Sequence, residues 1–168
     1  MSIGLLFFNC SSGDKPNNDD SDQNNKIDNT TISNSSNSIN NLDDVKRPNS
    51  SNQAIGYYKG MPANGIFSNY YSNGNLKHKM EFKDGYGKGQ DIQYYPNGNQ
   101  KSITYRVNGW PNGTLIFFYE NGNIKSKCNF DGSGVRQGDA QWYNPDGSIK
   151  GNGLYSKNTL VKCSGNCS

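Results

Sequence analysis

A short stretch of this chain is written four times. YYPNGNQK begins at Tyr94, and its relatives YYSNGNLK, FYENGNIK and WYNPDGSIK begin at Tyr70, Phe118 and Trp142. The four copies share a tyrosine in second place, at a spacing of 24 residues: Tyr71, Tyr95, Tyr119 and Tyr143. They also share a turn glycine, which comes one residue late in the last copy: Gly74, Gly98, Gly122 and Gly147. Self-similarity at a fixed period predicts a repeat architecture.

Each copy has the signature of a β-hairpin. Between successive copies lies a second pair of glycines: Gly85 and Gly89, Gly109 and Gly113, and Gly132 and Gly138. Two turns and two runs of about 6 to 8 residues per period fit strands and leave no room for helices. Connections this short join antiparallel neighbours. The predicted fold is all-β, an elongated, twisted antiparallel meander of β-hairpin repeats with about eight or nine strands.

The turn in each copy decides which side chains share a face. Asn-Gly alone fits a two-residue type I′ loop, whereas Pro96-Asn97-Gly98 fits a type I turn closed by a left-handed glycine, a three-residue loop with a bulge. The two differ by one residue of pairing, which exchanges the faces. We favour the three-residue loop because it separates apolar from basic residues.

The three-residue loop predicts two unlike faces. One is apolar: Ile66, Tyr70, Leu76, Met80, Phe82, Ile92, Tyr94, Ile116, Phe118, Ile124, Cys128, Phe130, Ala140, Trp142 and Ile149. The other carries the four repeat tyrosines with a row of lysines: Lys77, Lys101, Lys125 and Lys150. Ile103, Tyr105 and Val107 fall on this second face, which predicts a bulge or an irregular strand there.

The sequence divides into four parts. Residues 1–10 form an apolar run, and residues 156–168 form a C-terminal cap or tail after the repeats at 56–155. Between Ser11 and Gln53, Asn, Ser and Asp make up 27 of 43 residues. Such a composition buries too little apolar surface to offset the entropy of ordering the backbone, so residues 11–55 are predicted to be a disordered linker.

The first ten residues, MSIGLLFFNC, end in Cys10. They resemble the end of a bacterial lipoprotein signal, in which an apolar run precedes a cysteine that becomes acylated. Asn9 stands where a small residue is usual, and no basic segment precedes the run. The resemblance implies lipidation of Cys10, with the linker as a tether to a membrane.

The repeat itself resembles the MORN-type repeat, in the bacterial variant found in the family labelled YwqK-like antitoxins. The residues that carry the match in the first copy recur in the later ones: Tyr70, Tyr71, Asn73, Gly74, Leu76, Lys77, Phe82, Gly85 and Gly89. The resemblance implies an elongated sheet used for protein interaction, and contact with phospholipid in some members.

Catalytic chemistry has little support in this sequence. His78 is its one histidine, and its place on the predicted apolar face favours a structural role. No His, Cys and Asp spacing fits a metal site, so no catalytic residue, metal or cofactor is expected. Cys163 and Cys167 are close enough to form a disulfide in an exported protein, the alternative being two free thiols. Cys128 is read as a small core residue.

These observations predict a binding protein that is not an enzyme. The candidate interaction face is the tyrosine and lysine row, and an apolar sheet face left uncovered would mark a second interface. We expect a lipoprotein of the cell envelope, on the periplasmic side or the cell surface, with a protein partner and no nucleic acid. A cytosolic antitoxin that binds a toxin is the alternative. A repeat protein contacting anionic phospholipid through its lysines is a further one.

Overall fold

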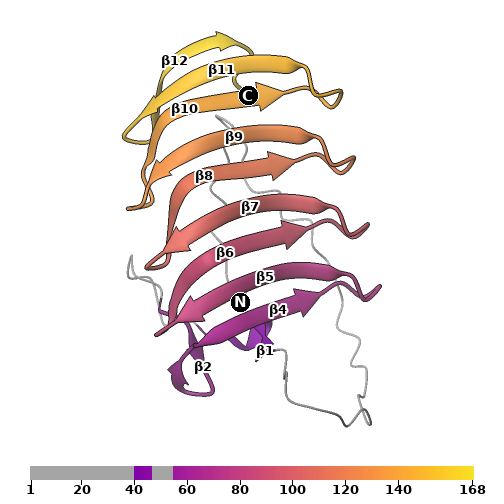
Figure 1. Cartoon of the computed structure of the whole chain (residues 1–168), viewed down its shortest axis with the longest axis vertical. Coiled ribbons are helices and arrows are strands. Elements are labelled where there is room, and N and C mark those ends of the chain that lie inside the picture. Colours follow the sequence, from indigo (N-terminus) through magenta and orange to yellow (C-terminus); the bar gives the residue numbers. More distant parts are fainter. Residues whose placement is uncertain (1–39, 47–54) are drawn as a thin grey trace.

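The structure is a computed structural model that describes residues 40–46 and 55–168. One ten-stranded sheet contains most of them, and its strands stack along the long axis of the molecule (Figure 1). In spatial order these strands are β1 Asn40–Asn41, β4 Gly65–Tyr70, β5 Leu76–Lys83, β6 Tyr86–Tyr94, β7 Gln100–Val107, β8 Trp110–Phe118, β9 Ile124–Asp131, β10 Arg136–Tyr143, β11 Ile149–Ser156 and β12 Thr159–Gly165. A small ribbon of β2 (Tyr57–Tyr58) and β3 (Met61–Pro62) and a 3-10 turn, η1 (Leu42–Asp44), complete the described part.

The predicted meander is confirmed. The nine strands from β4 to β12 follow one another in the sheet in chain order, each antiparallel to the next. β1 is the exception, because it joins the sheet parallel to β4. The C-terminal residues predicted as a cap or tail include β12, which is the last strand of the sheet.

Two kinds of turn alternate along the two long edges of the sheet. On one edge, the Gly98 amide donates to the Tyr95 carbonyl at 2.9 Å, and Gly98 has φ = 90°. This is the predicted three-residue loop, a type I turn closed by a left-handed glycine. On the other edge, Asp84-Gly85 and Asn108-Gly109 have both residues at positive φ, which is the two-residue type I′ geometry.

A second irregularity follows each three-residue loop. Tyr94 pairs with Gln100, but Gln93 pairs with Ser102, so Lys101 has no cross-strand partner residue. The same shift recurs in every copy, and the residue passed over is always a lysine: Lys77, Lys101, Lys125 and Lys150. Such a bulge inserts one residue and reverses the alternation of side chains beyond it.

The lysine bulge divides the predicted apolar face in two, so that prediction was wrong. Beyond the bulge, six of its residues lie on a buried face, which we call the core face: Met80, Phe82, Cys128, Phe130, Ala140 and Trp142. Their cross-strand partners Phe67 and Leu115, which were not predicted, lie on the same face. The rest lie on the opposite side, which we call the open face: Ile66, Tyr70, Leu76, Ile92, Tyr94, Ile116, Phe118, Ile124 and Ile149. Strand β7 itself is continuous, and its predicted irregularity lies in its pairing with β8, between Ile103 and Tyr105.

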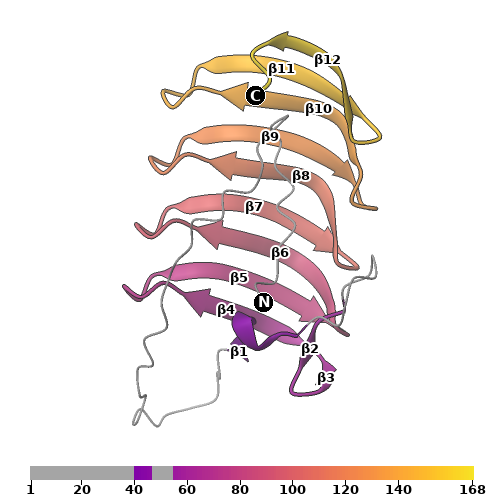
Figure 2. The same ribbon diagram turned by 180° about the vertical axis from the view of Figure 1, so that it is seen from behind.

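The core face holds two apolar clusters. One lies at the N-terminal end of the sheet: Val45, Ala63, Phe67, Met80 and Phe82. The other lies over β8 to β11: Leu115, Cys128, Phe130, Ala140, Trp142, Tyr155 and Cys167. Figure 2 shows the sheet from behind, with β1, η1 and the β2–β3 ribbon gathered at its N-terminal end.

Residues 40–46 fall within the segment predicted to be disordered, and that prediction was wrong for them. Val45 is 8% exposed in the N-terminal cluster, and Leu42 packs against the same cluster. The Lys46 amide donates to the Tyr57 carbonyl at 2.8 Å. Two apolar residues in a polar segment are therefore enough to dock this stretch on the first strands. The remaining linker residues, 11–39 and 47–54, lie outside the described residues.

Candidate interaction surfaces

The repeat tyrosines tie each copy to the next one. The Tyr71 hydroxyl donates to the Tyr94 carbonyl at 2.7 Å, and the Tyr95 hydroxyl donates to the Phe118 carbonyl at 2.8 Å. Tyr119 repeats the contact with the Tyr143 carbonyl at 2.8 Å. These rings are half-buried along the edge of the three-residue loops. Their hydroxyls are thus used within the stack, which favours a structural role over ligand recognition.

Tyr143 is not the structural equivalent of these three tyrosines. In the last copy the loop runs from Asn144, whose amide donates to the Ser148 carbonyl as the Tyr95 amide donates to that of Asn99. Tyr143 pairs with Ile149 and so takes the place of Tyr70, Tyr94 and Phe118. The Tyr143 hydroxyl donates to Gln141 Oε1 instead. The extra residue that delays Gly147 accounts for this change.

Asparagines form a parallel set of contacts at the loop tips. The side-chain amides of Asn73 and Asn75 both donate to the Pro96 carbonyl, at 2.9 and 2.7 Å. Asn97 and Asn99 do the same to Glu120, and Asn121 and Asn123 to Pro145. The Asn-Gly-Asn element of the repeat therefore links successive loops in addition to shaping each turn.

The predicted lysine row lies beside the tyrosines. The ammonium groups of Lys77, Lys101 and Lys125 lie 5.4, 5.8 and 5.9 Å from the ring centroids of the tyrosines in their own copies, Tyr71, Tyr95 and Tyr119. Such cation–π contacts are worth about 0.5–1 kcal/mol at exposed positions. The fourth lysine differs, because Lys150 donates to the Ser168 carbonyl at 2.7 Å. Lys127 lies over Tyr143 in its place, at 5.6 Å.

The surroundings of Tyr95 favour the protonated form of its hydroxyl. Burial raises the pKa of the Tyr95 hydroxyl, and the nearby Glu120 carboxylate raises it further. Tyr95 therefore stays protonated and remains a hydrogen-bond donor at any physiological pH.

The open face is a surface that the sequence patterns did not separate from the core. Near the loops it carries one row of aromatic and aliphatic side chains, which we call the aromatic row: Tyr70, Leu76, Tyr94, Phe118, Ile124, Tyr143 and Ile149. Tyr70 is 47% exposed and Ile149 is 60% exposed. Adjacent apolar residues within one strand, such as Phe67 beside Ile66 and Leu115 beside Ile116, were the available signal that both faces are apolar.

Further from the loops, the open face is hollowed. A shallow depression of about 390 Å³ lies over β4 to β7. Ile66 and Tyr105 stand at its sides, each 50% exposed, and Ile92 lies below them at 8%. Lys79, Glu81, Gln90 and Gly89 complete the lining.

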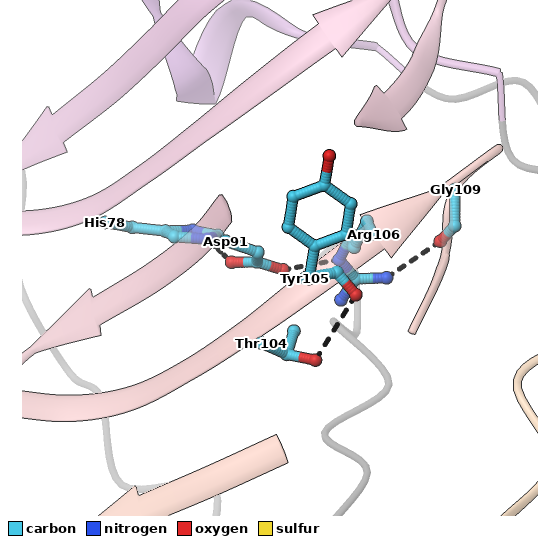
Figure 3. A network of polar contacts seen from close by, with 6 residues as sticks. All are labelled: His78, Asp91, Thr104, Tyr105, Arg106 and Gly109. Atoms are coloured by element: carbon cyan, nitrogen blue, oxygen red, sulfur yellow. Dashed lines mark hydrogen bonds and ion pairs between the residues drawn. The ribbon is translucent and has the colours of Figure 1, made fainter. Parts of the chain in front are cut away.

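A buried polar network crosses the middle of the core face (Figure 3). His78 Nε2 lies 2.6 Å from Asp91 Oδ1, and Arg106 Nε donates to Asp91 Oδ2 at 2.5 Å. Arg106 also donates to the Gly109 carbonyl at 2.8 Å. Burial of the Asp91 carboxyl raises its pKa, but the His78 hydrogen bond and the Arg106 charge outweigh burial, so the pKa is lowered. Both oxygens of the Asp91 carboxylate are engaged, so Asp91 acts as a structural anchor that holds His78 and Arg106 in place.

The cysteines fall into two groups. The structure joins Cys163 and Cys167 in a disulfide, and Cys167 is buried in the C-terminal cluster. Cys128 is 1% exposed in the same cluster and is also disulfide-bonded, so none of the described cysteines is a free thiol. Cys10, the predicted lipidation site, lies outside the described residues. Within those residues, no helix has the length and apolar character to cross a membrane.

Comparison with known families supports the repeat assignment. Three segments match the model of the MORN repeat variant: residues 63–84, 111–131 and 136–157. Each segment contains one strand–turn–strand unit or its greater part. The second copy, which holds Asp91 and Arg106, is not among the matched segments. No curated protein sequence matches this chain.

Proposed function

We propose that this chain is a binding protein without enzymatic activity, anchored to a membrane of the cell envelope through Cys10, and that its aromatic row holds a protein partner. The observation that carries the binding role is the open face. Five of the seven large apolar side chains that are most exposed in the described residues lie there: Ile66, Tyr70, Tyr105, Ile149 and Leu154. Exposed apolar side chains gathered on one face mark interaction sites.

Three further observations support the proposal. MORN-type repeats are consistent with a binding module built from a regular surface. His78, the chain's one histidine, is held by Asp91 in the core network and is not placed for proton transfer to a substrate. The Cys163–Cys167 disulfide fits an oxidising compartment outside the cytoplasm.

The binding role is tested by photo-crosslinking in cells. A photoreactive residue at Phe118, in the aromatic row, is expected to capture a partner protein, and the same residue at exposed Lys157, on the opposite edge, is the matched control. Equal capture at both positions, or none at Phe118, contradicts the proposed surface.

The anchor is tested separately, by metabolic labelling with a fatty-acid analogue and cell fractionation. The native chain is expected to carry the label and to fractionate with membranes, and Cys10→Ala is expected to lose both. An unlabelled, cytosolic native chain contradicts the anchor, and a toxin captured at Phe118 would then favour the antitoxin-like alternative. Membrane binding that persists in Cys10→Ala but is lost in high salt would favour the phospholipid alternative.

A further inference from the structure

The open face of β4 to β8 carries a pattern of charges and apolar residues that complements itself. Two neighbouring rows cross these five strands. The first row, further from the three-residue loops, comprises Ile66, Glu81, Gln90, Tyr105 and Asn112. The second row comprises Ser68, Lys79, Ile92, Ile103 and Ile116, in which each residue pairs directly with the next.

From this pattern we propose that the open face over β4 to β8 is a homodimer interface, in which two chains pack face to face about a two-fold axis lying between the two rows. In a two-fold interface, if residue i contacts residue j, then j contacts i. The axis runs across the strands and lies between the two rows. It therefore places the first row of each chain opposite the second row of the other chain. Lys79 then faces Glu81 of the second chain, Glu81 faces Lys79, and Tyr105 faces Ile103.

The charges on this surface are available for such contacts. Lys79 and Glu81 are both exposed, and neither forms a salt bridge with another described residue. They are two residues apart on β5 and therefore point to the same side, about 7 Å apart along the strand. The axis between them makes both pairs attractive at once. An axis parallel to the strands and centred on β6 would instead exchange β5 with β7 and place Lys79 against Ile103 of the second chain, with no opposite charge.

The apolar part of the surface supplies the rest of the contact. Ile92, Ile103 and Ile116 form an unbroken isoleucine line across three strands. The depression between Ile66 and Tyr105 accommodates a side chain from the facing sheet. Sheets that pack in this way keep their strands within about 30° of each other, about 10 Å apart.

The size of the surface sets the expected affinity. Five strands span about 19 Å, and two rows with their margins extend about 13 Å along the strands. This footprint of roughly 250 Å² per chain is smaller than that of a standard specific interface, so we expect weak dimerisation, with a dissociation constant on the order of 100 µM. The dimer leaves the aromatic row at its rim, and its formation does not depend on the membrane anchor or on the proposed partner.

The test uses the full 168-residue chain in sedimentation equilibrium from about 1 to 200 µM, a range that begins well below the expected dissociation constant and ends above it. The native chain is expected to pass from monomer to dimer across this range. Lys79→Glu and Glu81→Lys are each expected to weaken dimerisation about tenfold or more, because each creates two like-charge pairs. The double variant K79E/E81K restores both pairs in reverse and is expected to dimerise as the native chain does.

A mixture gives the sharpest result. Lys79→Glu leaves this pair of positions acidic and Glu81→Lys leaves it basic, so the two single variants are expected to form a heterodimer when mixed. Ile103→Lys, a change on the open face that leaves the core face intact, is expected to abolish the dimer. A native chain that stays monomeric at 200 µM overturns the proposal, as does a dimer unaffected by Ile103→Lys or a mixture of the single variants that remains monomeric.

Discussion

The hairpins β6–β7 and β8–β9 place different chemistry at equivalent positions of the core face. Asp91, Thr104 and Arg106 in the first stand 24 residues before Leu115, Cys128 and Phe130 in the second. The backbone is the same in both, with the same loop, the same lysine bulge and the same inter-copy hydrogen bonds. Side chains at these positions are nonetheless an ion-paired network in one hairpin and an apolar cluster in the other.

The difference shows that the repeat specifies backbone geometry more strictly than it specifies the core. Turns and bulges depend on glycine, asparagine and lysine at fixed places, and these recur in both hairpins. A core position needs only a side chain that fills the available volume and whose polar atoms have hydrogen-bond partners. Asp91 meets that need with His78 and Arg106, and Phe130 meets it by apolar burial.

The largest expected effect comes from the apolar hairpin. Phe130→Ala removes a ring that is 4% exposed and leaves a cavity, so it should lower the free energy of unfolding by about 3–5 kcal/mol. Arg106→Ala, at the equivalent position, should cost less, because Arg106 is partly exposed and Asp91 keeps its contact with His78. Urea unfolding followed by circular dichroism gives both values. Equal costs would mean that the two hairpins do not differ in the way described.

The next prediction compares breaking the Asp91 network with replacing it by apolar side chains. Asp91→Ala leaves two polar partners without their carboxylate and should cost about 2–4 kcal/mol, at or below the usual range for a buried pair because Arg106 is partly exposed. Grafting the chemistry of the other copies, as D91L/R106F/H78S, should recover most of that loss, since apolar replacements of buried ion pairs are often neutral or stabilising. The same urea titrations measure this. A graft less stable than Asp91→Ala would show that the network is required by this hairpin.

A smaller effect is expected on acidification. The pKa of Asp91 is lowered from its ordinary value of 3.8, so the network stabilises the fold above that value and this stability is lost as the pH falls through the lower folded-state pKa. Between about pH 5 and pH 2 the native chain should therefore lose more stability than D91L/R106F/H78S.

Comparing the native chain with D91L/R106F/H78S removes the contribution of other carboxylates from the measured pH dependence of stability. Hydrogen bonds from Ser133 and Ser148 lower the pKa values of Asp131 and Asp146, and these groups are identical in both chains. Their contributions therefore cancel in the difference. Parallel stability curves for the two chains would assign the acid sensitivity to groups outside the network.

The fold could be predicted from the sequence because its determinants are local. A period of 24 residues, two turns per period and Pro-Asn-Gly in the loop specify strand number, order and turn type without any long-range contact. The division of the two faces could not be predicted in the same way. The lysine bulge shifts the strand pairing by one residue, but it contains no glycine that would mark a bulge in the sequence. Apolar residues occur on both faces of the strands, so the exchange of faces beyond the bulge leaves no visible change in the hydrophobic pattern.

The candidate surfaces show the same division between local and long-range information. The tyrosines and lysines of the turn edge were identified from their period, but their hydroxyl contacts join residues 23 or 24 apart and depend on strand stacking. Tyr143 was misplaced because the residue added before Gly147 shifts the loop, and not the strand, of the last copy. The Asp91 network was missed because its three members come from three strands, with His78 as the one visible signal.

The smallest expected effect tests whether the two hairpins share the same inter-copy contact. Tyr95→Phe, at the loop of β6–β7, and Tyr119→Phe, at that of β8–β9, each remove one hydroxyl that donates to a backbone carbonyl at 2.8 Å. Each should cost about 0.5–1.5 kcal/mol, the range for one intramolecular hydrogen bond, and the two costs should agree closely. Tyr105→Phe is the matched control, because its ring is half exposed on the open face, and its stability should not change by more than about 0.5 kcal/mol. Unequal costs for the two repeat tyrosines would mean that the side chains of the core face affect the contacts at the edge of the three-residue loops. Equal costs beside unequal Phe130 and Arg106 effects would locate the difference between the hairpins in their core side chains alone.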